Sequence, residues 1–170
     1  MTRFSLLFLS LSSTLVLGCG TEEDTTPEHL LPLAGEWSIA TTGYANDDCN
    51  ADGFLIAFDS ITVADVDTSS FSITYYLENE RIGDSSSNCS HAGDDTFECD
   101  ELAHSTPFSG STTINMTAIG SVTVNSDNAI SGTGDLVLNC TGPDCDQLAG
   151  MTKTGTLPCN TTLNWTATAN

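Results

Sequence analysis

The chain has 170 residues, the length of one ordinary domain, and 39% of them are hydrophobic, so it can bury a sizeable core. Its basic residues are Arg3, Arg81 and Lys153, against 23 Asp and Glu, which gives a formal net charge of −20. A chain of this charge cannot neutralise a row of phosphates or attach electrostatically to an anionic membrane, so nucleic acid and polybasic membrane binding are excluded.

Residues 1–18 have the composition of an export signal. Arg3 precedes an apolar stretch from Phe4 to Leu17 that is too short and too rich in Ser and Thr for a membrane-spanning helix, which needs ~20 apolar residues. The stretch is followed by Gly18-Cys19, a pair that resembles the lipobox of bacterial lipoproteins. This resemblance implies cleavage before the cysteine, its acylation, and membrane attachment through the new N-terminus. A residue other than Asp after the cysteine, here Gly20, implies the outer membrane.

The cysteine count agrees with this interpretation. An odd thiol is a liability in an oxidising compartment, and acylation of Cys19 reduces seven cysteines to an even six. Six cysteines in an exported domain predict three disulfides. They are Cys49, Cys89, Cys99, Cys140, Cys145 and Cys159.

The segment 19–29 predicts a flexible acidic tether between the acylated cysteine and the domain. It carries charge and a proline, and after the cysteine it has no apolar side chain that could hold it against a core. We therefore expect a single domain over residues 30–170.

The domain begins with a short motif, Gly35-Glu-Trp37, at the start of a predicted first strand that runs from about Trp37 to Tyr44. The motif resembles the Gly-x-Trp opening of lipocalins and of small lipocalin-like bacterial lipoproteins. The resemblance implies an eight-stranded barrel whose closed end is plugged by the tryptophan and whose interior holds a small apolar ligand.

Residues 48–59 fit the spacing of a calcium-binding loop, with oxygen ligands on alternate residues and a glycine, Gly53, at the sharp turn. The same residues also suit an acidic turn between strands, because Phe54 to Val66 has the pattern of a strand and neither flank that of a helix. Calcium is the one cofactor that the sequence indicates. Its ligands would be Asp48, Asn50, Asp52, the Phe54 carbonyl and Asp59.

Further along the chain, apolar and polar residues alternate in long runs, which is typical of strands with one buried face. Inward-facing glycines at 120, 132 and 134 mark places where strands bend. Long, bent, antiparallel strands favour an all-β meander closed into a barrel over a β-sandwich, which remains the alternative. The runs are residues 71–78, 114–124, 130–140 and 157–169.

In such a meander, four cysteines gather at one end of the barrel: Cys49, Cys140, Cys145 and Cys159. We expect them to pair among themselves, either with Cys140 joined to Cys159 or with Cys49 joined to Cys159 and Cys140 to Cys145. Cys89 then pairs with Cys99.

These features predict a lipid-anchored envelope protein that acts as a non-catalytic binding or structural module, with a small apolar ligand as one occupant. Its expected partner is the membrane, through the lipid, and the sequence identifies no ligand or protein partner. One alternative is a calcium-dependent surface module that uses the 48–59 loop. Another is an envelope hydrolase that uses paired carboxylates, such as Asp94 and Asp95, but the sequence contains no nucleophile or metal motif to support it.

Overall fold

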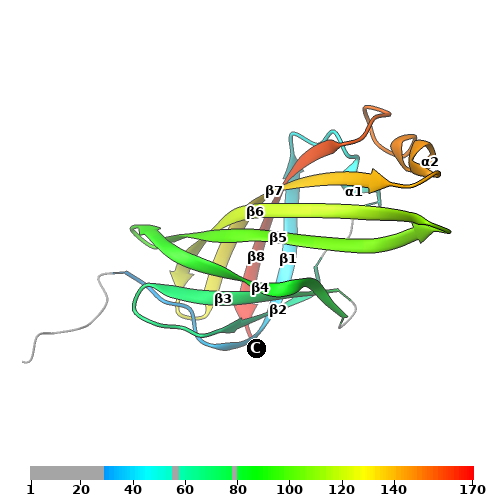
Figure 1. Cartoon of the computed structure of the whole chain (residues 1–170). Coiled ribbons are helices and arrows are strands. Elements are labelled where there is room, and N and C mark those ends of the chain that lie inside the picture. Colours follow the sequence, from blue (N-terminus) through cyan, green and yellow to red (C-terminus); the bar gives the residue numbers. More distant parts are fainter. Residues whose placement is uncertain (1–28, 55–57, 78–79) are drawn as a thin grey trace, which may run out of the picture.

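The computed structural model describes residues 29–54, 58–77 and 80–170. Within them, eight antiparallel strands pair in chain order, and the first pairs with the last to close a barrel (Figure 1). No helix in these ranges has the length and hydropathy of a membrane-spanning segment. The strands are β1 (Gly35–Ala45), β2 (Ser60–Ala64), β3 (Ser70–Leu77), β4 (Glu80–Gly93), β5 (Thr96–Ser109), β6 (Thr112–Ser126), β7 (Ala129–Thr141) and β8 (Cys159–Ala169), and two short helices are α1 (Ala51–Phe54) and α2 (Cys145–Ala149).

The predicted closed meander is confirmed, and the β-sandwich alternative is wrong. Each strand is hydrogen-bonded to both of its neighbours around the barrel, so there are no two separate sheets to face each other. Two of the alternating runs, 114–124 and 130–140, form the β6–β7 hairpin, whose register extends from Thr113 opposite Thr141 to Ser126 opposite Ala129. Side chains on alternate positions point inward, as the period of a strand requires.

The segment from Phe54 to Val66 departs from the expected continuous strand. Phe54 belongs to the short helix α1, and β2 begins at Ser60. At the start of this helix, the Asp47 carboxylate accepts a hydrogen bond from the Ala51 N–H at 2.8 Å, which satisfies one of the backbone donors that the first turn of a helix leaves without an intrahelical partner. The strand ends at Ala64 because Asp65 has a φ of 52°, in the left-handed region that interrupts a strand.

One half of the barrel interior is filled with side chains. Trp37 lies at its end, fully buried, and its indole N–H donates to the Leu33 carbonyl at 3.1 Å. Packing is tightest at Gly132, where an added Cβ would lie 2.1 Å from Cζ2 of Trp165. The buried residues of this half are Trp37, Ile61, Val63, Phe71, Ile73, Phe97, Val122, Val124, Ile130, Trp165 and Ala167.

The residues before β1 cover this filled end. The ring of His29 stacks on that of His91 with centroids 3.8 Å apart, and the Leu30 N–H donates to the Asp95 carboxylate at 2.6 Å. The Leu33 N–H donates to the Asp127 carbonyl at 2.8 Å. The packed part of the chain therefore includes His29, which the sequence placed in the tether; residues 19–28 lie outside the described part.

Three disulfides join the six predicted cysteines. Cys89 pairs with Cys99, Cys49 with Cys159, and Cys140 with Cys145, which is the second of the two expected arrangements. The Asp48 N–H donates to the Asn160 carbonyl at 2.9 Å, which brings the chain after β1 alongside the start of β8. This contact places Cys49 beside Cys159, so Cys140 pairs with its near neighbour Cys145.

Candidate binding cavity

The half of the barrel opposite Trp37 contains a cavity of about 430 Å³. This volume lies within the range of about 300–1,000 Å³ that is typical of small-molecule sites. The cavity is formed by the ends of β1, β3, β5 and β7 and the beginnings of β4, β6 and β8. Its lining residues are Tyr44, Phe58, Leu77, Glu80, Arg81, Ile82, His104, Thr106, Ile114, Met116, Leu136, Leu138, Thr161 and Leu163.

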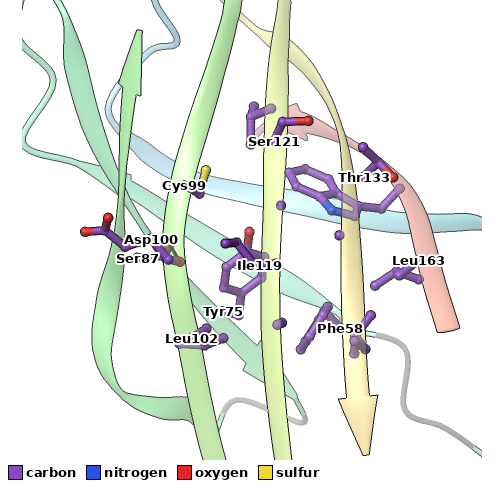
Figure 2. Close-up of a pocket in the computed structure, with 16 residues that line it drawn as sticks. Phe58, Tyr75, Ser87, Cys99, Asp100, Leu102, Ile119, Ser121, Thr133 and Leu163 are labelled. Carbon is purple, nitrogen blue, oxygen red and sulfur yellow. Dashed lines mark hydrogen bonds between the residues drawn. The ribbon is translucent and has the colours of Figure 1, made fainter. Parts of the chain in front are cut away.

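A layer of apolar side chains separates this cavity from the filled half. Phe58, Leu136 and Leu163 line both the large cavity and a much smaller one of about 40 Å³ on the filled side. Figure 2 shows this smaller space, with the Tyr75 ring between β5 and β6 and Phe58 beside it. It is large enough only for water molecules, so the large cavity is the one suited to a ligand.

The wall of the large cavity is incomplete between β4 and β5. Among the residues whose pairing is described, these strands are in register from Cys89 opposite Cys99 to Gly93 opposite Thr96. Next to the disulfide, the Ser87 hydroxyl still donates to the Asp100 carbonyl at 2.6 Å, and beyond this point the strands separate (Figure 1). The register of β4 against β3 also shifts between Tyr75 and Ile73, where β4 accommodates extra residues.

Polar groups gather at the rim near β1. The Lys153 ammonium lies 2.5 Å from the Asp47 carboxylate and 3.3 Å from that of Asp52. Burial opposes ionisation of Asp47, but the hydrogen bonds from Lys153 and from the Ala51 N–H outweigh it and hold the pKa of Asp47 below its usual value. The hydrogen bond to Asp47 raises the pKa of Lys153.

Burial also disfavours the ionised form of the tyrosines, and for them it determines the direction in which the pKa shifts. Burial raises the pKa of Tyr75 strongly. It also raises the pKa of Tyr44, with a further contribution from the negative charge of Asp47. Both tyrosines are therefore neutral at physiological pH.

The predicted calcium ligands make other contacts in the structure. Asp52 forms an ion pair with Lys153, the Asn50 amide donates to the Met151 carbonyl at 3.2 Å, and Asp59 accepts from the Ser60 hydroxyl at 3.2 Å. Residues 55–57 of the loop lie outside the described part of the chain. The described residues contain no group of three or more His, Cys, Asp or Glu placed to hold a metal ion. Calcium binding stays a prediction, tested by comparing thermal unfolding in calcium and in chelator.

The structure places the other predicted site residues as follows. Gly35 begins β1, and Trp37 plugs the filled end of the barrel. Cys19 lies outside the described residues.

Sequence reasoning did not identify the cavity-lining residues as a site. The alternation in residues 114–124 and 130–140 places Met116 and Leu138 on inward faces, but alternation alone does not say at which end of a strand the interior is empty. The signal that could have located the filled half is the position of three large aromatic residues, because Trp37, Phe71 and Phe97 lie near the starts of β1, β3 and β5 and are all buried.

Comparison of the chain with protein-family models, with curated proteins and with solved structures finds no match.

Proposed function

We propose that this protein is a lipid-anchored binding protein of the bacterial cell envelope, and that its barrel holds a small, mainly apolar ligand. The observation that carries the proposal is the cavity of about 430 Å³ in the half of the barrel opposite Trp37. Aliphatic and aromatic side chains dominate its lining, and a few polar groups, among them Thr106 and Thr161, supply hydrogen bonds for orientation.

A neutral, environment-sensitive naphthylamine dye tests the cavity directly. We expect its fluorescence to rise on binding, and Met116→Trp to weaken binding by about tenfold because the indole occupies ligand space. The matched control is Val137→Trp, at a β7 residue next to the cavity-lining Leu138 but on the outer face, where the side chain is 36% exposed. Equal dye binding by the two variants would contradict the proposal.

The anchor is supported by the lipobox-like sequence at Cys19 and by the parity of the remaining cysteines. The chain from His29 onward joins the barrel at the filled end, so a tether from Cys19 meets the molecule opposite the cavity. Acyl chains contribute about 0.8 kcal/mol for each buried methylene, so lipidation holds a protein firmly on a membrane.

Detergent-phase partitioning of cell extracts tests the anchor. We expect the wild type and a Thr21→Ala control in the detergent phase and Cys19→Ala in the aqueous phase. Partitioning of the cysteine variant with the wild type would show that Cys19 carries no lipid.

A further inference from the structure

The register of β3 against β4 determines which charged residue faces the cavity. Leu77 lies opposite Glu80, and Tyr76 lies opposite Arg81. Residues directly opposite each other in paired strands point to the same face of a sheet, and Leu77 packs against the core inside the barrel. Glu80 therefore points inward and Arg81 outward, although both reach the rim of the cavity.

Glu80 lies where the apolar interior meets the solvent. It is exposed, whereas Ile82, two residues further along β4 and on the same face, is buried. Among the described residues that line the cavity, Glu80 is the one with a carboxylate, and it forms no ion pair with any other described residue. A positively charged group on a ligand could therefore pair with this carboxylate.

The rim near β1 is negative as well. Two carboxylates, those of Asp47 and Asp52, share the single ammonium group of Lys153, which leaves one net negative charge. Tyr44 lines the cavity on this side, and its pKa is raised by burial and, in addition, by the negative charges of Asp47 and Asp52. The negative potential therefore extends to the cavity wall.

The same charges disfavour an anionic ligand. Of the basic residues in the described part of the chain, Lys153 is already held by two carboxylates, and Arg81 points outward. His104 also lines the cavity, and an imidazole is positively charged only when it is protonated. The formal charge of −20 attracts cations and repels anions from a distance. A carboxylate on a ligand would therefore be repelled at the mouth of the cavity.

We propose that the ligand of the cavity is a cationic amphiphile, an apolar chain that carries one ammonium group. The chain lies among Leu77, Ile82 and Met116, and the ammonium group stays at the mouth, paired with Glu80. This inference rests on the proposed function in that the same cavity takes up the apolar part. It adds the chemical class of the ligand and the direction in which the ligand lies.

Three probes with the same alkyl chain separate charge from apolar burial. They are decylammonium, decan-1-ol and decanoate, and each competes with the naphthylamine dye at low ionic strength and at a slightly alkaline pH that disfavours protonated imidazole. We expect decylammonium to bind about fivefold more tightly than decan-1-ol, and decanoate to bind more weakly than either. Salt should reduce the advantage of decylammonium over the alcohol, because ions screen exposed charges.

Two neutralising variants locate the ion pair. Glu80→Gln should weaken binding of decylammonium by about threefold to fivefold and leave binding of decan-1-ol unchanged. Glu36→Gln is the matched control, because it changes the net charge equally at an exposed β1 residue next to Trp37, at the filled end, and it should affect neither probe.

A third variant shows whether the ammonium probe enters the barrel. Met116→Trp takes up ligand space, so it should weaken binding of decylammonium and of the dye by the same factor. Adsorption of a cation to the acidic surface of the protein would be insensitive to this change.

Four outcomes would overturn the inference. They are equal affinities for decylammonium and decan-1-ol, tightest binding of decanoate, equal effects of Glu80→Gln and Glu36→Gln, and an effect of Met116→Trp on the dye but not on decylammonium. Each of them leaves the proposed function standing, because the cavity still takes up the dye. Failure of the dye to bind contradicts the proposed function itself, whatever the three probes do.

Discussion

Replacing Gly132 by Ala tests how closely the filled half of the barrel is packed. The added Cβ would lie 2.1 Å from Cζ2 and 2.2 Å from Cε2 of Trp165, whereas carbon atoms in contact stay about 3.5–4.0 Å apart. The ring would have to move by more than about 1 Å, but it is 4% exposed and surrounded by core side chains. Overpacking of this kind costs about 1–3 kcal/mol, so we expect Tm to fall by roughly 3–10 °C for a domain of this size.

Gly134→Ala is the matched control, two residues along β7 and on the same face. Its added Cβ would meet the Ile119 carbonyl oxygen at 3.6 Å, an ordinary contact. Neither glycine has a positive φ, so alanine meets no backbone penalty, and by restricting the unfolded chain it should leave stability unchanged or raise it by up to about 1 kcal/mol. Far-ultraviolet circular dichroism during heating measures both variants. Equal Tm values would refute the packing of Trp165 against Gly132.

Three further predictions concern ionisation and cross-links. Folding lowers the pKa of Asp47, so this residue contributes to the stability of the fold above its unfolded pKa of about 3.9, and the contribution is lost as pH falls through the folded pKa. The difference in unfolding free energy between the wild type and Asp47→Asn, measured with urea, should therefore become smaller in acid. A difference that does not change with pH would contradict the ion pair. Burial raises the pKa of Tyr75, so its contribution to the stability of the fold is complete below about pH 10 and is lost as pH rises further. In a titration followed by phenolate absorbance, we expect one tyrosine to ionise at higher pH than the others, and Tyr75→Phe should remove that step. The Cys49–Cys159 disulfide links residues that are 110 positions apart, whereas Cys140–Cys145 links residues that are 5 apart, and a longer closed loop restricts the unfolded chain more. Replacing the first pair by Ala should therefore lower the free energy of unfolding by about 4.8 kcal/mol, and replacing the second pair by about 2 kcal/mol. Equal urea midpoints for the two variants would contradict this order.

Side-chain alternation was sufficient to predict the barrel, because a strand with one buried face leaves a pattern that needs no knowledge of its partners. Ile114 and Met116 fall on the inner face, and Ile119, the one residue out of phase, is 57% exposed. The position of Cys49 just past β1 likewise followed from strand order. These properties are local, or depend only on the sequence of strand directions.

The cavity could not be predicted in the same way. Whether a layer of the barrel is filled depends on the sizes of side chains that are far apart in the sequence, such as Phe58 and Leu163, which line both cavities. The departure of β4 from β5 depends on the shift in register between Ile82 and Ser87, a region where the sequence lacks clear alternation. Helix α1 was missed because a single turn held by one Asp47 hydrogen bond has no helical periodicity to detect.

The closure of the barrel by β1 and β8 has a consequence for how this protein reaches its folded state. The strand nearest the N-terminus must find one nearest the C-terminus, with Trp37 opposite Ala169, so the last contacts to form span almost the whole domain. If the chain emerges from a translocation channel N-terminus first, β1 waits with an unpaired edge until β8 has crossed, and such long-range pairing is slow. During that delay the partly assembled sheet is open to intermolecular aggregation, and the repulsion between chains with a formal charge of −20 opposes it.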